Sequence, residues 1–378
     1  MENKDCKIIA YYLPQFHQIP ENDTFWGKGF TEWVNVKKAK PLFEGHCQPR
    51  VPLNNNYYDL SDENVLIWQA ELAKKYGVYG FCFYHYWFYE KPILEKPLYN
   101  FLYNKDIDIN FCFCWANESW TNAWSSSDRS VIMEQKYGDK EEWERHFNFL
   151  LPFFKDDRYI KEENKPLLVI YRPYLCECIV EMLDYWKDLA VKNGFSGLKI
   201  ASQRFEKPED NYQAYNYQAY NYLDYHIEYQ PDYDKCHYKN ADKLTFKLKK
   251  FVKNIFLEKL NIDIHIKKKN RKPIIFSYDD MWNEIISVHP ESNKSIAGGF
   301  VDWDNTPRHG SRGTCFEGAT PDKFEKYLRM QMKHIDKEYL NDYLFMFAWN
   351  EWGEGGYLEP DEKNEYKYLQ AIYNALFL

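Results

Sequence analysis

Short runs of consecutive apolar residues alternate along the chain with longer segments in which apolar residues return every three or four positions. Continuous apolar runs are typical of parallel strands covered on both faces, whereas the wider spacing is typical of helices with one buried face. Eight runs predict strands, at residues 7–13, 78–84, 107–115, 166–171, 198–203, 225–229, 296–302 and 343–349.

Helical segments separate most of these strands. Ser61 is a candidate N-cap for one helix and Gly77 its stop signal, while Thr320 and Pro321 fit the cap and first turn of another. The predicted helices cover residues 61–76, 141–154, 176–193, 321–335 and 364–377.

Eight strands alternating with helices over 378 residues predict an α/β fold. We expect a (β/α)8 TIM barrel, formed as a single catalytic domain over residues 1–378 with long βα-loops; a doubly wound open sheet is the alternative. Residues 206–290 follow the alternation least, and they predict an irregular, basic insertion within that domain.

Aromatic residues are unusually frequent, since 33 Tyr, 26 Phe and 13 Trp make up 19% of the chain. Aromatic rings cover the apolar faces of sugars, but they also fill protein cores, so composition supports both interpretations equally. The net charge of −8 argues against a nucleic-acid partner.

Nine cysteines are scattered without paired spacing, and several lie in apolar runs, which predicts reduced, buried thiols. No secretion signal is recognised, and no apolar stretch approaches the ~18 residues that a membrane span needs, so we expect a cytoplasmic protein. Convincing metal-ligand spacing and glycine-rich phosphate-binding loops are also missing, so the sequence predicts no metal and no cofactor.

Polar and aromatic side chains follow nearly every predicted strand. In a barrel, catalytic groups lie where strands end and βα-loops begin, and so many polar–aromatic ends together favour a sugar-binding cleft over solvent-exposed loops. The predicted substrate-binding residues are Tyr12, His17, Trp26, Glu32, Trp33, His85, Tyr86, Trp87, Trp115, Asn117, Glu118, Trp124, Arg172, Asp302, Trp303 and Asn350.

Some of these residues also fit ordinary structural roles. His17 and His85 are compatible with satisfied structural histidines, and Arg172 with an ion pair to a neighbouring strand-end acid. Asp302 begins an acid-x-acid triplet of the kind found in metal-dependent sugar-nucleotide transferases, but three residues make a weak signal.

The last predicted strand ends in FAWNEWGEGGYLEP, which contains Glu351 and Glu354. Glycosidic bond cleavage uses two carboxylates, one acting on the bridging oxygen and the other near the anomeric carbon. The glycines allow a sharp turn that brings both side chains together, and the tryptophans would lower the local dielectric. The amide of Asn350 is placed to bind a sugar hydroxyl or Glu351. We therefore predict Glu351 and Glu354 as the catalytic pair, with a loop salt bridge as the structural alternative.

The motif WNEWGEG, followed by LEP, resembles the one that carries the two glutamates of glycoside hydrolase family 99, the endo-α-mannosidase-type barrels. The chain is more similar, over almost its full length, to the WbsX-type proteins. These are family-99-like domains associated with bacterial surface-polysaccharide biosynthesis and often described as glycosyltransferases. The segments that carry this resemblance are YYLPQFHQIPENDTFWGKGFTEW, FYHYWF, LEKPL, FCWANESWTNAW, KPLLVIYRP and WDNTPRHG.

The resemblance implies a (β/α)8 barrel and a retaining mechanism through a 1,2-anhydro sugar. By motif position, Glu351 would deprotonate the sugar 2-hydroxyl, and Glu354 would be the acid/base for the leaving group and the incoming water or acceptor. Gly353 departs from the family pattern, where a histidine is common, which puts substrate contacts in doubt. Glu118 paired with Glu351 is the competing assignment, because Asn117-Glu118 resembles the acid/base dipeptide of other retaining barrels.

Three functions remain open from the sequence. The first is a glycoside hydrolase or transglycosidase that acts on a polysaccharide or oligosaccharide. The second is a glycosyltransferase of O-antigen or capsule biosynthesis, whose donor phosphate would need cations such as Arg172, Arg204 or Arg308. The third is an inactive glycan-binding module, which would not need both glutamates.

Residues 235–272 depart from the acidic whole, with 13 Lys and Arg against three acids. Apolar residues interleave with these lysines at roughly helical spacing, which is typical of a solvated outer helix. The alternative is peripheral contact with an anionic membrane, which would bring the site to a lipid-linked glycan.

Overall fold

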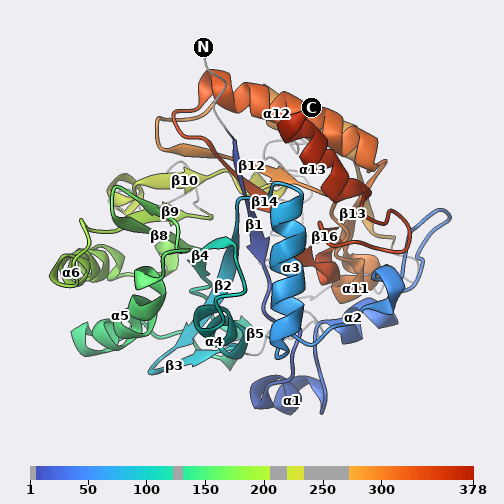
Figure 1. Ribbon diagram of the computed structural model, residues 1–378. Coiled ribbons are helices and arrows are strands. Elements are labelled where there is room, and N and C mark those ends of the chain that lie inside the picture. The colour runs from blue at the N-terminus through green and yellow to red at the C-terminus, as the bar shows by residue number, and fades with distance from the viewer. Residues whose placement is uncertain (1–5, 122–130, 205–218, 234–271) are drawn as a thin grey trace, which may run out of the picture.

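The computed structural model describes residues 6–121, 131–204, 219–233 and 272–378. Eight parallel strands form a closed barrel, in which β1 pairs with β14 on one side and β2 on the other (Figure 1). Every strand predicted from the apolar runs is present. The barrel strands are β1 (Lys7–Tyr12), β2 (Gly80–Phe88), β4 (Asn110–Trp115), β8 (Lys165–Ile170), β9 (Lys199–Ser202), β10 (Tyr225–Ile227), β12 (Ser295–Phe300) and β14 (Tyr343–Phe347).

Helices surround the barrel, as expected for a (β/α)8 fold. The five predicted helices correspond to α3 (Glu63–Lys75), α5 (Lys140–Lys155), α6 (Ile179–Lys192), α12 (Pro321–Glu338) and α13 (Lys367–Phe377). Two more, α4 (Lys96–Tyr103) and α10 (Tyr278–Ser287), were not predicted, because eight or ten residues give too few turns for a clear periodicity.

Helix caps partly follow the sequence signals. Thr320 accepts a hydrogen bond from the backbone N–H of Lys323 and caps α12 as predicted. The prediction of Ser61 for α3 was wrong by one residue, because the Asp62 carboxylate accepts the N–H of Asn64 instead. A carboxylate at this position also interacts favourably with the helix dipole.

The barrel interior is filled by aromatic rings and thiols. Tyr11 lies among three of these rings, with centroid distances of 5.7 Å to Tyr84, 5.3 Å to Tyr229 and 5.6 Å to Phe345. The eight described cysteines form no disulfide with one another. No helix within the described ranges is both long and apolar enough to cross a bilayer.

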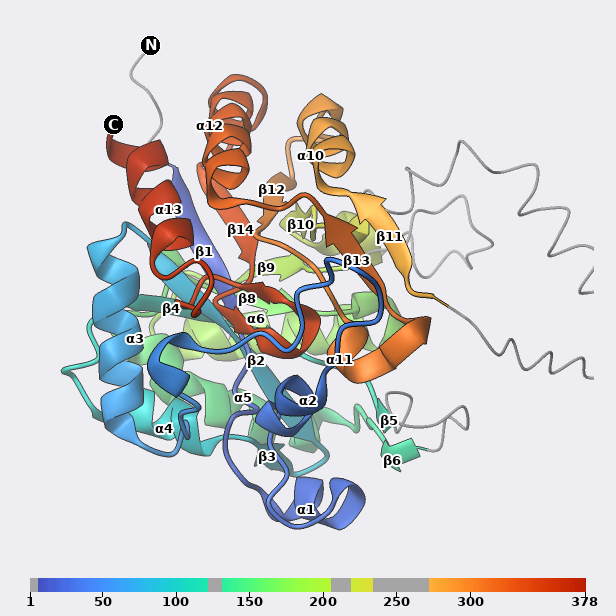
Figure 2. The same cartoon turned by 90° about the vertical axis from the view of Figure 1, so that its right-hand side faces the viewer.

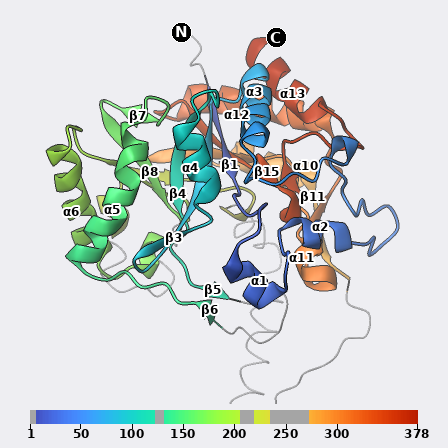
Figure 3. The same cartoon turned by 60° about the horizontal axis from the view of Figure 1, so that its bottom comes forward.

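Most of the short elements gather at the end of the barrel where the strands finish, whereas β7 (Lys161–Glu162) pairs with the first residues of β8 at the opposite end (Figure 3). The parallel pair β11–β13 lies outside the barrel, close to α11 (Figure 2). The short elements are α1 (Pro20–Trp26), α2 (Trp33–Lys38), α11 (Thr306–His309), β3 (Lys91–Ile93), β5 (Trp120–Thr121), β6 (Val131–Met133), β7 (Lys161–Glu162), β11 (Ile274–Ser277), β13 (Thr314–Glu317), β15 (Asn350–Glu351), β16 (Gly356–Tyr357) and the 3-10 turns η1 (Leu53–Asn55), η2 (Pro173–Leu175), η4 (Gly310–Arg312) and η5 (Trp352–Glu354).

The interval 206–290 contains regular elements where it is described. β10 is a full member of the barrel, and β11 leads directly into α10, which packs beside α12. The basic segment predicted at 235–272 lies almost entirely outside the described residues.

Candidate active site

One arginine gathers three carboxylates at the mouth of the barrel. Arg308 donates from Nε to Glu32 Oε1 at 2.7 Å, from Nη2 to Glu351 Oε1 at 2.6 Å and from Nη1 to Glu354 Oε1 at 2.8 Å. We call these four residues the Arg308 cluster. Because one rigid guanidinium binds both Glu351 and Glu354, the two predicted catalytic carboxylates converge.

Each member reaches the cluster from a different loop. Glu32 precedes α2 in the loop after β1, Arg308 lies in α11 after β12, and both Glu351 and Glu354 follow β14. The carboxyl ends of parallel barrel strands meet at one end of the barrel, so loops far apart in sequence deliver their side chains to the same place.

Gly353 makes this close packing possible. A Cβ at this position would lie 2.1 Å from Glu32 Oε1 and 2.8 Å from Arg308 Nε. Two residues on, Gly355 adopts a left-handed backbone with φ of 67°, which closes the turn after Glu354. Both glycines therefore serve the packing and turning of the loop that carries the glutamates.

Three members of the Arg308 cluster are buried, and the charges of the cluster interact strongly. The side chains of Glu32, Arg308 and Glu351 are 0%, 3% and 7% exposed. Burial raises the pKa of Glu351 to about 8, against the opposing effect of the Arg308 cation. Burial alone would lower the pKa of Arg308, but the three carboxylates hold it well above its ordinary value. One cation facing three acids thus favours a proton retained near neutral pH.

A cleft opens onto this cluster. Its cavity volume of about 180 Å³ is roughly tenfold what one buried water needs, which leaves room for a larger ligand. The lining residues are Leu13, Gln15, Asn22, Trp26, Phe30, Tyr84, Tyr86, Ala116, Glu118, Ser119, Trp120, Thr121, Ile132, Tyr171, Arg204, Tyr229, Arg308, Glu351 and Glu354.

Three residues predicted to bind substrate, Trp26, Tyr86 and Glu118, line the cleft. Glu32 joins through its bond to Arg308, and Arg172 joins through an ion pair to Glu118 Oε2 at 2.8 Å. Trp124 lies outside the described residues.

Three predicted aromatics pack into the core instead and do not line the cleft. Tyr12 points away from the barrel axis and donates to Gln69 Oε1 on α3. Trp33 donates to the Tyr58 carbonyl, and Trp303 lies 5.0 Å from the ring of Phe347. Each of these rings fills space between elements.

The predicted histidines have structural surroundings. His17 Nδ1 lies 2.9 Å from the Pro14 carbonyl oxygen. His85 Nε2 lies 2.8 Å from His146 Nε2 on α5, and burial lowers the pKa of His85 to about 3. Both histidines lie outside the lining of the cleft.

Two predicted tryptophans flank the same buried region. Trp87 donates to Glu142 Oε1 at 2.8 Å, and its ring stacks on His146 at 4.6 Å between centroids. Trp115 packs against His146 and Trp186. These rings cover the outer face of the strands rather than the cleft.

Both predicted asparagines join strand ends. Asn350 accepts the backbone N–H of Leu13 and donates to its carbonyl, so its amide does not reach Glu351. Asn117 makes the same double contact with the backbone of Arg172. These amides replace missing backbone partners where the sheet ends.

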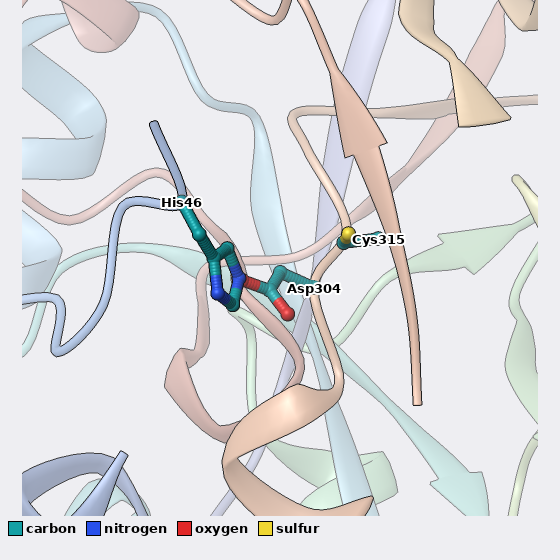
Figure 4. Close-up of side chains that lie close together, drawn as sticks. All are labelled: His46, Asp304 and Cys315. Carbon is teal, nitrogen blue, oxygen red and sulfur yellow. The ribbon is translucent and has the colours of Figure 1, made fainter. Parts of the chain in front are cut away.

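Asp302 lies away from the cleft and pairs with Arg50 Nη2 at 2.8 Å. Its neighbour Asp304 joins a group with His46 and Cys315, the one set of potential metal ligands within 4.8 Å that the described part of the chain contains (Figure 4). The backbone N–H of Leu42 donates to His46 Nδ1, which leaves the ring proton on Nε2, pointing at Asp304 Oδ2 at 2.8 Å. A ligating histidine would instead need Nε2 free of a proton, so this group fits a structural hydrogen bond and not a metal centre.

The site also contains residues that were not among the predicted substrate contacts or catalytic pair. Arg308 and Arg204 were considered only as donor-phosphate cations, although both follow predicted strands. Arg204 pairs with Asp232, and its guanidinium lies 5.2 Å and 5.0 Å from the ring centroids of Tyr171 and Tyr229. Their position at strand ends was the available signal.

The structure resembles solved carbohydrate enzymes. An endo-alpha-mannosidase of glycoside hydrolase family 99 from Bacteroides thetaiotaomicron aligns with a TM-score of 0.52 and 13% identity, over 98% of this chain and 96% of that one. A protein described as glycoside hydrolase-like aligns with a TM-score of 0.54 and 10% identity, over 100% and 96%. At such low identity the likeness establishes the barrel fold.

Sequence relatives extend over the whole chain. The uncharacterized protein WxcX of Xanthomonas campestris pv. campestris is 31% identical over 378 residues, and that of strain B100 is 32% identical over 383 residues. The chain spans about half the length of both relatives. The family model described as Glycosyltransferase WbsX matches residues 8–372, and the chain therefore belongs to the WbsX glycosyltransferase family.

Proposed function

We propose that this chain is a carbohydrate-active enzyme that acts on a glycosidic bond with Glu351 and Glu354 as its two carboxylates. One observation carries the proposal: a single buried guanidinium holds both carboxylates beside a ligand-sized cleft. Buried acids with a shifted pKa are typical of sites that move protons.

The chemistry takes two steps in this proposal. Glu351 removes the proton from the sugar 2-hydroxyl, whose oxygen bonds to the anomeric carbon while the old glycosidic bond breaks and Glu354 protonates the leaving oxygen. Water or an acceptor hydroxyl then gives its proton to Glu354 and attacks the anomeric carbon. The 1,2-anhydro ring opens, and Glu351 returns its proton to the 2-oxygen, so configuration is retained.

Glu351 suits the role of base because of its surroundings. A carboxylate with a pKa of about 8 is a strong base once it is ionised, and the Arg308 cation steadies the charge that it then carries. Glu354 is more exposed, at 21%, which fits exchange of protons with the leaving group and acceptor.

Transfer to a sugar acceptor is the second candidate outcome, and it would fit the glycosyltransferase description of the family. Both outcomes share the first step and differ only in what enters the second. We place the substrate among polysaccharides or oligosaccharides because Trp26, Tyr86 and Trp120 present aromatic surface to the cleft.

The experiment compares Glu351→Gln, Glu354→Gln and Glu118→Gln on a panel of α-linked oligosaccharides in ¹⁸O-labelled water. Either of the first two changes should lower turnover about 10²–10⁴-fold, the usual range for removing an acid/base group. Glu118→Gln tests the competing pair, because it removes another acid that lines the same cleft.

Product mass then separates the outcomes, since hydrolysis adds one ¹⁸O atom to the new reducing end and transfer adds none. Full turnover by Glu354→Gln would contradict the proposed pair. A loss in Glu118→Gln equal to that in Glu351→Gln would favour the competing pair of Glu118 and Glu351.

A further inference from the structure

Two neighbouring arginines, flanked by one acid on each side, lie along one half of the barrel mouth. Glu118 follows β4, Arg172 follows β8, Arg204 follows β9 and Asp232 follows β10, which are four consecutive strands of the barrel. Arg172 pairs with Glu118 and Arg204 with Asp232. We call these four residues the paired row. Unlike the Arg308 cluster, it has one carboxylate for each guanidinium.

Tyr171 contacts both arginines of the paired row. Its ring centroid is 4.9 Å from the guanidinium carbon of Arg172 and 5.2 Å from that of Arg204. Tyr229 contacts Arg204 at 5.0 Å as well. Stacking on aromatic rings fixes the plane of a guanidinium and lowers the entropy that is lost when it binds a ligand.

Arg204 retains hydrogen-bonding capacity inside the cleft. It lines the cavity, and its side chain is 29% exposed. Its Nη2 donates to Asp232, while its buried Nε–H has no hydrogen-bond partner among the described residues. The buried Nε–H of Arg172 likewise has no hydrogen-bond partner among the described residues. A buried donor without a partner costs free energy, so a ligand that accepts these hydrogen bonds would be bound favourably.

Arg204 also lies near the proposed catalytic pair. Burial raises the pKa of Tyr229, while the Arg204 cation opposes the rise and Glu354 adds to it, so the Tyr229 hydroxyl is within electrostatic range of both. Tyr229, Arg204 and Glu354 all line the same cleft. A ligand group held by Arg204 would thus belong to a sugar at or next to the reacting ring.

From this geometry we infer that the cleft accepts an anionic sugar, whose carboxylate or phosphate is bound by Arg204 with support from Arg172. The inference rests on the proposed function for the location of the reacting ring. Planar forks of N–H donors match the oxygen pairs of carboxylates and phosphates, and such charge-assisted bonds are stronger than neutral ones.

Two sources supply this chemistry. A carboxylate would come from a uronic acid within the glycan, and a phosphate from an activated sugar donor. The two arginines and two acids of the paired row cancel in charge, so the row exerts little long-range repulsion on a carboxylate or a phosphate. The two sources differ in where the charge is attached to the ring, so small probes distinguish them.

The experiment measures binding by isothermal titration calorimetry to the complete chain. The probes are methyl glucuronide, glucose 1-phosphate and the neutral methyl glucoside. Wild-type protein should bind at least one anionic probe about tenfold more tightly than the neutral probe. Arg204→Gln should abolish this preference, and Arg172→Gln should reduce it about threefold.

Arg329→Gln is the matched control, because it removes an arginine that pairs with Glu325 on the outer helix α12. It should leave the preference unchanged. Equal binding of all probes by wild-type protein, no binding of either anion, or a preserved preference in Arg204→Gln would each overturn the inference. Circular dichroism of each variant ensures that the fold is intact, and Arg172→Gln still tests the inference if Arg204→Gln does not fold.

The readout separates this inference from the proposed function, because binding does not require turnover. An anion preference in a protein whose Glu351→Gln and Glu354→Gln variants behave like wild type would retain the anionic site and reject the catalytic pair. Turnover of neutral glycans by a protein without an anion preference would retain the catalytic proposal and reject the anionic site.

Discussion

The two halves of the barrel mouth differ in how many acids face each arginine. In the Arg308 cluster one guanidinium serves three carboxylates, and the arginine side chain is only 3% exposed. In the paired row each arginine has one carboxylate, and Arg172 and Arg204 are each 29% exposed. On one side of the mouth the arginine is buried and outnumbered by acids. On the other side the arginines are partly exposed, and each has one acid.

This difference in burial and charge suits the two sides of the mouth to different roles. An excess of buried carboxylates over cations cannot be fully ionised without a large electrostatic cost, so a proton is retained there and becomes available for chemistry. A balanced and partly exposed row stays ionised and offers its remaining donors to a ligand. We therefore propose proton transfer by residues on one side of the mouth and ligand binding by residues on the other.

Removal of Arg308 should have the largest effect on this contrast. Arg308→Met leaves three buried carboxylates without their cation, and we expect a loss of about 3–5 kcal/mol in the free energy of unfolding at pH 8. Denaturant titration measures it. Acidification to pH 5 should shrink the loss, because the carboxylates then become protonated.

The control for that experiment is Arg312→Met, which changes an exposed arginine four residues further on. It should cost less than 0.5 kcal/mol, roughly the usual effect at a surface position. Equal losses in the two variants would show that Arg308 is not the centre of a buried charge cluster.

The pH dependence should follow the raised pKa of Glu351. As a base it must be ionised while Glu354 keeps its proton, so the rising limb of the kcat/KM profile should climb about tenfold per pH unit from pH 6 and bend near pH 8. A pH–rate profile on any substrate found above measures this. A rate that falls instead through pH 8 would make Glu351 the acid and reverse the two roles.

Stability should move in the opposite direction over the same range. The pKa of Glu351 is raised from 4.5 to about 8, so the folded chain holds this proton more tightly than the unfolded chain. The contribution is complete below about pH 4.5 and is lost as the pH rises through 8. Glu351→Gln should flatten this part of the stability profile, as measured by denaturant titration at several pH values.

Gly353 sharpens the comparison at an intermediate level. Gly353→Ala places a methyl group into the space between Glu32 and Arg308, and we expect a loss of about 1–3 kcal/mol in the free energy of unfolding. The same substitution should cost less in the Arg308→Met background, because the contact with Arg308 Nε is then gone and only the one with Glu32 remains. Additive losses in this double-mutant cycle would show that the methyl group disturbs something else.

Changes in the paired row should have the smallest effect on the free energy of unfolding. Glu118→Gln breaks an ion pair whose side chains are 37% and 29% exposed, and we expect a loss of less than about 1 kcal/mol that decreases further at high salt. Thermal unfolding at low and high ionic strength measures it. A loss as large as that of Arg308→Met would remove the energetic distinction between the two halves.

The barrel itself was predictable because its strands are buried on both faces. Runs such as residues 7–13 and 343–349 are apolar without interruption, and that pattern depends on local sequence alone. The same continuity hides which residues face inward. Neighbouring residues on a strand point to opposite faces, and a run that is apolar on both faces gives no sign of its phase.

This ambiguity explains why several predicted site residues lie outside the cleft. Tyr11 faces the barrel interior and its neighbour Tyr12 faces α3. On β2, Tyr84 and Tyr86 line the cleft, whereas His85, between them, packs outward against His146 on α5. A shift of one residue therefore separates a ligand contact from a core contact.

The sequence by itself determined the eight strands, the order of their loops and the two glutamates of WNEWGEG, because each is a property of a continuous stretch of chain. Only the tertiary structure decided that Arg308 joins Glu32 to those glutamates and that Arg204 lines the cleft with a partly exposed side chain. These contacts cross more than 200 residues for Glu32, and they exist only because barrel closure brings the strand ends together.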